Sequence, residues 1–328
     1  MSAAGERAAR LLRWYPRGWR SRYGEEFAEL LVADIEERPR SRSRTADVIR
    51  GGIVARLADA GLCGCARGGA PQVRASLASL ACCAAVFLGF GGAMWSQLTI
   101  GWQWSAPPTA DAAVATFVMS AAMLVVAVLA LLAALPVAWT VVVRITRGRR
   151  KGLRSGLFGP SVLFLAGLVI VVAGGRHFGN GWPGTGGHPW ARHGLVPGGV
   201  AAFSWASTLS VSSFWAHPAA LAAFPAAELA WMAISPLALA GAVTGAATAV
   251  RRVELSPAVL RLETRLAVAA CGAMAVFLGG GCAWIADRTP RPGNLFHAGA
   301  IDVAGLVVMT LALAVGQRAA RQAQAGAR

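Results

Sequence analysis

The sequence predicts an all-α protein in which a six-span transmembrane helical bundle follows a small N-terminal cytoplasmic helical domain. Three observations predict this fold class. Hydrophobic residues make up 56% of the 328 residues and charged residues only 14%, which leaves too little polar surface to cover a soluble globule. Six apolar windows are long enough, or nearly so, to cross a ~30 Å hydrocarbon core as helices. The Lys and Arg residues are concentrated in alternate connections between these windows.

Residues 1–74 form the cytoplasmic prefix, which contains no apolar run long enough for a signal peptide or a span. Its pattern predicts three short helices. Pro16 and Pro39 end the first two, because proline and the residue before it disfavour helical geometry. Thr45 is a suitable N-cap for the third. The helices are expected over Arg7–Trp14, Ser21–Glu37 and Thr45–Ala60.

The transmembrane domain is predicted over residues 75–316, followed by a cytoplasmic tail at 317–328. A span needs about 20 apolar residues, because each helical residue rises ~1.5 Å and lipid offers the backbone no hydrogen-bond partner. The connection 176–225 is predicted as an outer loop. The six windows are Ala75–Trp95, Ala112–Trp139, Phe158–Gly175, Ala226–Val250, Leu266–Ile285 and Ile301–Gly316.

The distribution of positive charge predicts the orientation. Of the 31 Lys and Arg residues, 27 fall in the prefix, in residues 144–154, in residues 251–265 and in the tail. Cytoplasmic connections of membrane proteins carry such an excess. Both termini are therefore expected in the cytoplasm, with an even number of spans in the cell membrane. The four remaining residues are Arg176, Arg192, Arg288 and Arg291.

The stretch Ala201–Ala216 complicates the count of spans. It is apolar, but it carries six Ser and Thr residues and ends at His217-Pro218. If it crossed the membrane, the arginines of 251–265 would move to the outer side, against the positive-inside trend. We interpret it as an interfacial or re-entrant segment on the outer face. A seven-span bundle is the alternative.

Small residues predict two features of packing. Gly241 and Gly245 are four residues apart, a spacing that allows another helix to approach the fourth span closely. The sequence AVFLG occurs at Ala85–Gly89 in the first span and again at Ala275–Gly279 in the fifth. A parallel duplication would produce this echo. Chance similarity in a chain so rich in alanine and glycine is the alternative.

Several function classes are disfavoured. The net charge of +16 does not predict a nucleic-acid partner, because nine of the fifteen carboxylates lie among the arginines of the prefix. No two of the six cysteines lie in an exported loop, so no disulfide is expected. No Gly-rich nucleotide loop, HExxH, GxSxG or zinc-type cysteine pattern occurs. We therefore expect no enzyme, catalytic residue, cofactor or metal.

A cluster of titratable side chains is predicted on the outer side. Imidazole is the commonest metal ligand and titrates near neutral pH, but these histidines are spaced across glycine-rich sequence in no recognisable site pattern. We therefore interpret them as solvated loop histidines, and a metal or proton-sensing site is the alternative. The two carboxylates lie just inside outer ends of spans, where ionisable groups face a partner or water. The cluster consists of Glu228, Asp302, His177, His188, His193, His217 and His297.

The prefix contains a dense block of aromatic and charged residues, WYPRGWRSRYGEEF, over Trp14–Phe27. A unit of ~60 residues can bury little apolar surface, so large aromatic side chains would supply much of its core. Arg and Glu side chains would then satisfy each other around that core. The motif consists of Tyr15, Pro16, Trp19, Arg20, Arg22, Tyr23, Gly24, Glu25 and Glu26.

This motif resembles the short helical prefix that precedes the spans of bacterial export-type permeases and of uncharacterised actinobacterial multi-pass membrane proteins. The resemblance covers about residues 7–60 and implies a helical cytoplasmic unit. The similar permeases have a large outer domain between their first two spans, whereas only Ser96–Asp111 connects them here. The resemblance therefore does not imply transport activity.

Together these patterns predict an integral membrane protein of bacterial type whose partners are the lipid bilayer and a cytosolic or membrane protein. The first functional hypothesis is an accessory or regulatory protein whose prefix docks that partner. The prefix could equally be a folded cap that aids insertion, or could bind lipid headgroups through Arg38, Arg40, Arg42 and Arg44. The alternative hypothesis is a small-solute transporter or channel that uses the outer polar cluster.

Overall fold

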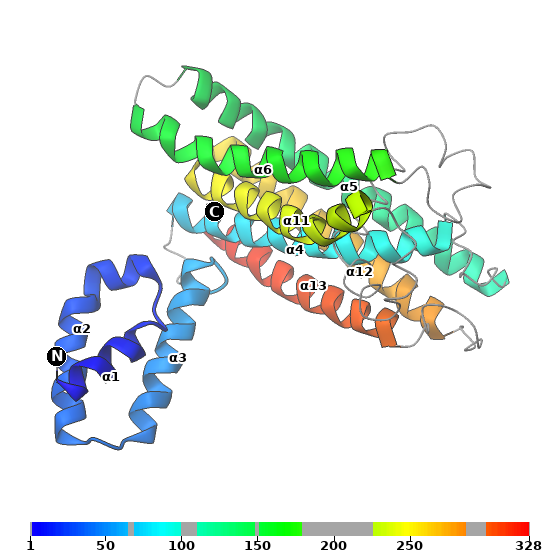
Figure 1. Ribbon diagram of the computed structural model, residues 1–328. Coiled ribbons are helices and arrows are strands. Elements are labelled where there is room, and N and C mark those ends of the chain that lie inside the picture. The colour runs from blue at the N-terminus through cyan, green and yellow to red at the C-terminus, as the bar shows by residue number, and fades with distance from the viewer. Residues whose placement is uncertain are drawn as a thin grey trace.

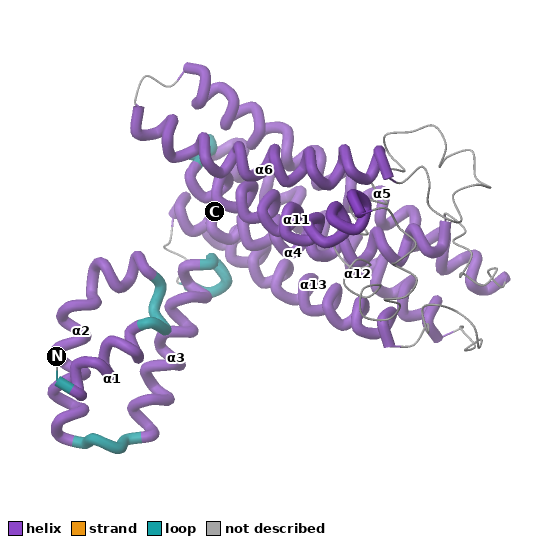
Figure 2. Tube along the Cα trace, viewed as in Figure 1, coloured by secondary structure: helices purple, strands orange, loops and turns teal. Residues whose placement is uncertain are grey.

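The computed structural model describes residues 2–64, 69–99, 110–147, 151–178, 226–286 and 300–327. Within these residues every regular element is an α-helix and none is a strand, which confirms the predicted all-α class (Figures 1 and 2). Six of the helices are long and apolar enough to cross a membrane. The chain therefore consists of a small helical prefix and a larger bundle, and the prefix lies beside one end of the bundle (Figure 1). We call this the prefix end.

The prefix contains three helices, as the sequence predicts. Helix α1 lies between α2 and α3 (Figure 1). The small core of the prefix is formed by Leu11, Tyr15, Leu31, Ile35 and Val48, which are all buried. The helices are α1 (Ala3–Leu12), α2 (Arg17–Glu37) and α3 (Arg42–Asp59).

Helix α3 begins earlier than predicted. Ser41, not Thr45, is its N-cap, and the Ser41 hydroxyl accepts a hydrogen bond from the Arg44 backbone N–H at 3.3 Å. Thr45 lies in the first turn, where its hydroxyl donates to the Ser41 carbonyl at 3.2 Å. Ser and Thr are both good N-caps, so sequence preference alone does not choose between them. The turn after Pro39 places Ser41 at the position where the helix starts.

The bundle contains six long helices, each of which includes one of the predicted windows. Most extend beyond their window at the prefix end, because hydropathy marks the lipid-exposed length and not the polar turns that continue it. Helix α12 thus begins nine residues before Leu266, and α13 continues through most of the predicted tail. The helices are α4 (Gly69–Thr99), α5 (Ala110–Arg147), α6 (Lys151–Phe178), α11 (Ala226–Arg252), α12 (Pro257–Ala286) and α13 (Ala300–Ala327).

Helices α6 and α11 pack tightly and antiparallel. A methyl group at Gly245 of α11 would lie 2.5 Å from the Pro160 carbonyl oxygen of α6, and one at Gly174 would lie 2.0 Å from Trp231 Nε1. The predicted close approach at Gly245 is therefore present, and its neighbour is the third span. The antiparallel arrangement is the one that a six-span chain requires. A seven-span chain would make these two helices parallel.

The other four bundle helices form two hairpins, α4–α5 and α12–α13, which are related by an approximate two-fold axis. Helix α4 packs along α13, and α12 packs along α5, so each hairpin exchanges the same kind of contact with the other. The two AVFLG copies meet at the centre, where the rings of Phe87 and Phe277 form an edge-to-face pair with centroids 5.4 Å apart. Both rings are fully buried.

A constant offset of 190 residues relates the two hairpins over their described lengths. With this offset Phe87 is equivalent to Phe277 and Met119 to Met309, and all four side chains are 0% exposed. The first residue of α5 is likewise equivalent to the first residue of α13. Contacts follow the same offset: Gly305 lies beside Phe90, and Gly280 lies beside Ala115. Duplication thus explains the sequence echo better than chance does.

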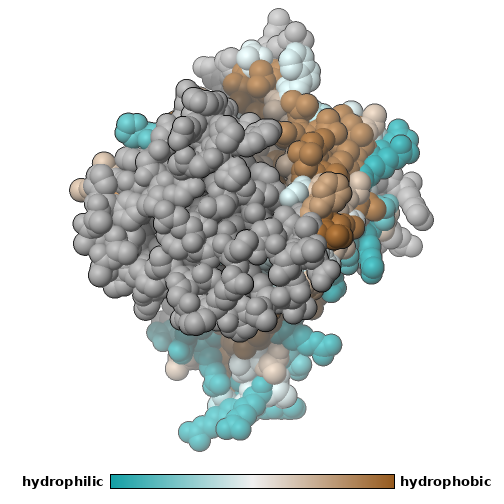
Figure 3. Space-filling view, turned by 90° about the vertical axis from the view of Figure 1, so that its right-hand side faces the viewer, coloured by the Kyte–Doolittle hydropathy of each residue, from teal (hydrophilic) through white to brown (hydrophobic). Residues whose placement is uncertain are grey.

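Apolar side chains cover the flanks of the bundle. In a view toward the far end of the bundle, hydrophobic surface gathers on one flank, and hydrophilic surface is most extensive below it, where the prefix lies (Figure 3). Large exposed apolar side chains are numerous on α5 and α6, an arrangement that a soluble protein avoids and a bilayer stabilises. Examples are Phe117, Leu124, Leu131, Leu135, Trp139, Phe158 and Leu165.

Candidate functional site

The predicted outer cluster lies partly beyond the part of the chain that the structure describes. His188, His193, His217 and His297 are outside the described residues. The remaining three belong to helix ends far from the prefix: His177 is next to the last residue of α6 and exposed, and Glu228 and Asp302 are the third residues of α11 and α13.

The backbone geometry brings two of these positions to one level. Gly174 of α6 packs against Trp231 of α11, and the two helices are antiparallel. His177 follows Gly174 by three residues and Glu228 precedes Trp231 by three, so the two positions lie side by side. Among the described residues no three His, Cys, Asp or Glu side chains come together as a metal site requires.

The prefix motif divides into a buried aromatic half and an exposed charged half. Tyr15 stacks on Trp19 with ring centroids 4.1 Å apart, and each of these rings forms an edge-to-face contact with Phe27. Burial raises the pKa of the Tyr15 hydroxyl, because the phenolate would lose its hydration. Of the five aromatic residues in Trp14–Phe27 that were expected to build a miniature core, these three do so, together with the aliphatic side chains of α1, α2 and α3. The expectation was wrong for Trp14 and Tyr23, which are 42% and 41% exposed.

The charged half of the motif lies on the surface of α2. Arg22 places its guanidinium carbon 5.2 Å from the centre of the Tyr23 ring, a cation–π contact. Glu25 and Glu26 are exposed. Arg20 has a buried Nε without a partner in the structure. Gly24 meets only an ordinary contact with Arg20, and Pro16 is the N-cap residue of α2.

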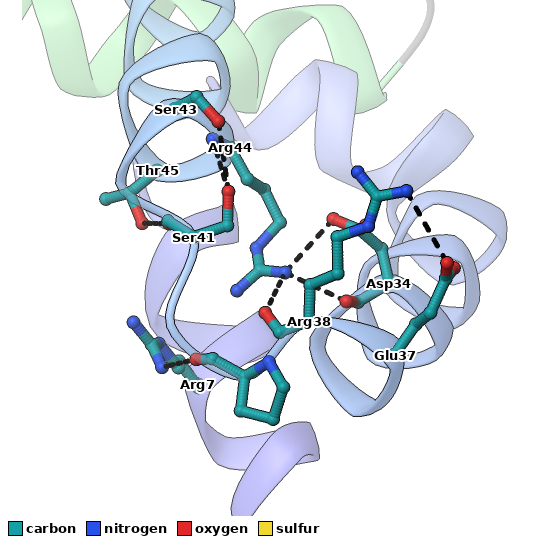
Figure 4. Close-up of polar contacts among 9 residues, drawn as sticks. Arg7, Asp34, Glu37, Arg38, Ser41, Ser43, Arg44 and Thr45 are labelled. Carbon is teal, nitrogen blue, oxygen red and sulfur yellow. Dashed lines mark hydrogen bonds and ion pairs between the residues drawn. The ribbon is translucent and has the colours of Figure 1, made fainter.

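Sequence reasoning missed the role of Arg44, which was grouped with the arginines available to lipid headgroups. Arg44 is buried, and its Nη1 donates to the Asp34 carbonyl and carboxylate and to the Arg38 carbonyl at 2.9–3.1 Å (Figure 4). It therefore ties the end of α2 to the start of α3 and is not available to headgroups. Arg7 donates to the Pro39 carbonyl in the same turn.

The main polar site of the described structure is the junction between the prefix and the bundle. The last carbonyl groups of a helix have no partner within that helix and carry partial negative charge. At the end of α3 they accept hydrogen bonds from three bundle helices. The donors are Gln72, Ser76 and Ser79 of α4, Arg251 of α11 and Arg318 of α13, and the acceptors are the carbonyls of Ala58, Asp59, Ala60, Gly61, Leu62 and Cys63.

The junction depends on the turn that ends α3. The Leu62 N–H donates to the Leu57 carbonyl at 2.8 Å and the Gly61 N–H to the Ala58 carbonyl at 2.9 Å, which is the Schellman pattern. Gly61 has φ +72°, a conformation that favours glycine. A methyl group there would lie 2.3 Å from the Ser76 backbone nitrogen of α4. Glycine is thus required both for the turn and for the close approach of α4.

Two strong junction contacts have well-defined geometry. Arg318 Nε donates to the Leu62 carbonyl at 2.7 Å, and Arg251 Nη2 donates to the Asp59 carbonyl at 2.9 Å. Arg251 also lies 3.7 Å from the Asp59 carboxylate. Positive side chains at the negative end of a helix dipole are stabilising. The junction therefore fixes the direction in which α3 leaves the bundle.

A neighbouring set of arginines holds the connection between α11 and α12. Arg74 of α4 donates to the Val253 carbonyl at 2.9 Å, and Arg144 of α5 bonds to both the carboxylate and the carbonyl of Glu254 at 3.0 Å. The arginines that the sequence assigns to orientation thus also have structural partners. The sequence shows these arginines as local clusters of positive charge. It does not show their acceptors, because these are mainly backbone carbonyls, which every residue has.

These observations define the protein as an all-α, multi-pass membrane protein with a separate helical prefix and a partly duplicated bundle. No protein-family model, curated protein or solved structure matches the chain.

Proposed function

We propose that this protein is an accessory or regulatory membrane protein whose prefix docks a protein partner and transmits its binding to the bundle. The observation that carries the proposal is the junction: α3 ends in hydrogen bonds to α4, α11 and α13, whereas α1 and α2 lie away from the bundle (Figure 1). A force applied to the prefix therefore reaches three spans through one rigid helix end.

A stripe along the outer face of α2 supports the docking role. Five exposed residues follow helical i, i+3, i+4, i+7 spacing, and Leu30 among them is 67% exposed. An exposed aromatic, a leucine and two carboxylates in one line suit an amphipathic partner segment with Lys or Arg beside its apolar side chains. The stripe consists of Tyr23, Glu26, Leu30, Ala33 and Glu37.

The orientation belongs to this proposal. The prefix, the ends of α5 and α13, the start of α6 and the connection 253–256 all lie at the prefix end (Figure 1). The positive charge of this end supports a cytoplasmic location for it. A cysteine introduced at exposed Ala46 would then be protected from a membrane-impermeant thiol reagent in intact cells and labelled after lysis. Labelling from outside would contradict the orientation.

The docking role is tested by affinity purification from mild detergent with full-length variants. We expect Leu30→Arg to remove a co-purifying partner, because it places a positive charge where a positive partner surface would pack. The matched control is Val54→Arg, which changes an exposed residue of α3 outside the stripe. Retention of every partner by Leu30→Arg, or equal loss in both variants, would contradict the docking surface.

Transmission is tested separately from docking. Arg318→Gln and Arg251→Gln remove junction donors but leave the α2 stripe unchanged. We expect both variants to keep the partner and to lose the protection from proteolysis that the partner gives to the prefix end of the bundle. A partner that protects the bundle equally in these variants would contradict transmission through the junction.

A further inference from the structure

A carboxylic acid side chain is buried inside the bundle at a position that the sequence assigned to a polar connection. Glu263 is the seventh residue of α12, about 9 Å along the helix from its first residue at ~1.5 Å per residue. Its side chain lies on the face that carries Leu260, Ala267 and Cys271, three members of a buried apolar cluster. Glu263 is only 6% exposed, and its Oε1 has no hydrogen-bond partner.

Three arginines of the surrounding helices bond to groups other than Glu263. On α4, Arg74 donates to the Val253 carbonyl; on α5, Arg144 pairs with Glu254; and on α13, Arg318 donates to the Leu62 carbonyl. Within the described part of the chain no Lys, Arg or His forms an ion pair with Glu263. An ionised carboxylate without a partner in such surroundings is costly, whereas the neutral acid costs much less.

Packing does not account for a glutamate here. The offset of 190 residues makes Val73 the equivalent of Glu263 in the other hairpin. Val73 is 1% exposed and belongs to the same apolar cluster. The repeated architecture is therefore compatible with an apolar residue at this position, so the carboxylate breaks the symmetry at a site where the fold does not require it.

We propose that Glu263 is a proton-binding site within the membrane domain that exchanges protons with the aqueous phase at the prefix end. A metal cation would need several oxygen ligands, and the side chains on its face of α12 within two turns are apolar. A proton needs only the carboxylate itself. Thr264, the adjacent hydroxyl, already donates to the Leu260 carbonyl at 2.7 Å.

The test uses a hydrophobic carbodiimide, which adds to the protonated form of a carboxyl group, on the full-length protein in liposomes. We expect mass spectrometry to find the adduct on Glu263 at neutral pH, to find less as the pH rises, and to find none in Glu263→Gln. The internal control is Glu254, which is exposed and paired with Arg144 and should stay unmodified.

A second measurement makes the result independent of reagent access. The infrared carbonyl band of a protonated carboxylic acid should be present in the wild type and absent in Glu263→Gln. Absence of both the adduct and this band would overturn the proposal. Suppression of the adduct by sodium ions at constant pH would also overturn it, because the site would then bind a metal cation.

Discussion

The two hairpins of the bundle, α4–α5 and α12–α13, agree at their centres and differ at the prefix end. Both place a phenylalanine and a methionine in the common core, at positions 190 residues apart. At the prefix end the first hairpin has Val73 and Arg74 where the second has Glu263 and Thr264. Helix α4 directly follows the prefix and donates to its carbonyls through Ser76 and Ser79, whereas the second hairpin reaches the prefix through Arg318 of α13. The comparison shows a shared scaffold whose halves have diverged where polar chemistry is concentrated.

The largest expected effect comes from the shared centre. Phe87→Ala and Phe277→Ala should each lower the free energy of unfolding by ~3–5 kcal/mol, because each removes a fully buried ring. The double variant should cost less than the sum, since the two rings contact each other. Unfolding in mixed detergent micelles would measure this. A near-zero cost for one ring alone would contradict the symmetric core.

A pair of equivalent glycine contacts sharpens the comparison. A methyl group at Gly280 would lie 2.8 Å from Met119 Cγ, whereas one at Gly305 would lie 3.7 Å from its nearest neighbour, Phe90 Cδ1. We expect Gly280→Ala to destabilise by ~1–3 kcal/mol through overpacking and Gly305→Ala to be nearly neutral. Thermal melting in detergent would compare them. Equal effects would mean that the two contacts are closer to identical than the structure indicates.

The third prediction disrupts the turn that joins the prefix to α4 of the first hairpin. Gly61→Ala should cost ~1–3 kcal/mol, because the residue has a positive φ and its methyl group would meet the α4 backbone. Limited proteolysis should then cut between the prefix and α4. The control Gly18→Ala, in a helix with open space around it, should leave the cleavage pattern unchanged. A stable, uncut Gly61→Ala variant would contradict a rigid junction.

The sequence predicted the fold well and the polar site poorly, for one physical reason. Apolar windows and helical periodicity identified six spans and three prefix helices, because these features repeat along the chain. The aromatic core of the prefix was identified only in part, since Trp14 and Tyr23 are exposed. The junction depends on backbone carbonyls as acceptors, and any residue type has one. The junction donors Arg251 and Arg318 therefore entered the sequence analysis only as positive charges.

The sequence analysis also placed Glu263 wrongly, in a connection and not in a span. Hydropathy started the fifth span at Leu266 because Glu263 and its neighbouring arginines lowered the local average. The residue was therefore assigned to a connection, although α12 begins at Pro257. Helical spacing with Leu260 and Ala267, or the alignment of Glu263 with Val73, would have placed it inside. Arg44 was missed similarly, since its partners lie in a turn that local sequence does not define.

The smallest expected effect comes from exchanging the residues that differ between the hairpins. Glu263→Val should change the free energy of unfolding by less than about 1 kcal/mol, because it removes a carboxyl with an unpartnered oxygen and restores the residue of the other half. The reciprocal change, Val73→Glu, should destabilise more, since it buries a second polar group in the same cluster. Melting of both variants at neutral pH would measure the asymmetry. A large loss in Glu263→Val would show that the carboxylate stabilises the fold, and its position would then be a structural requirement of the second hairpin.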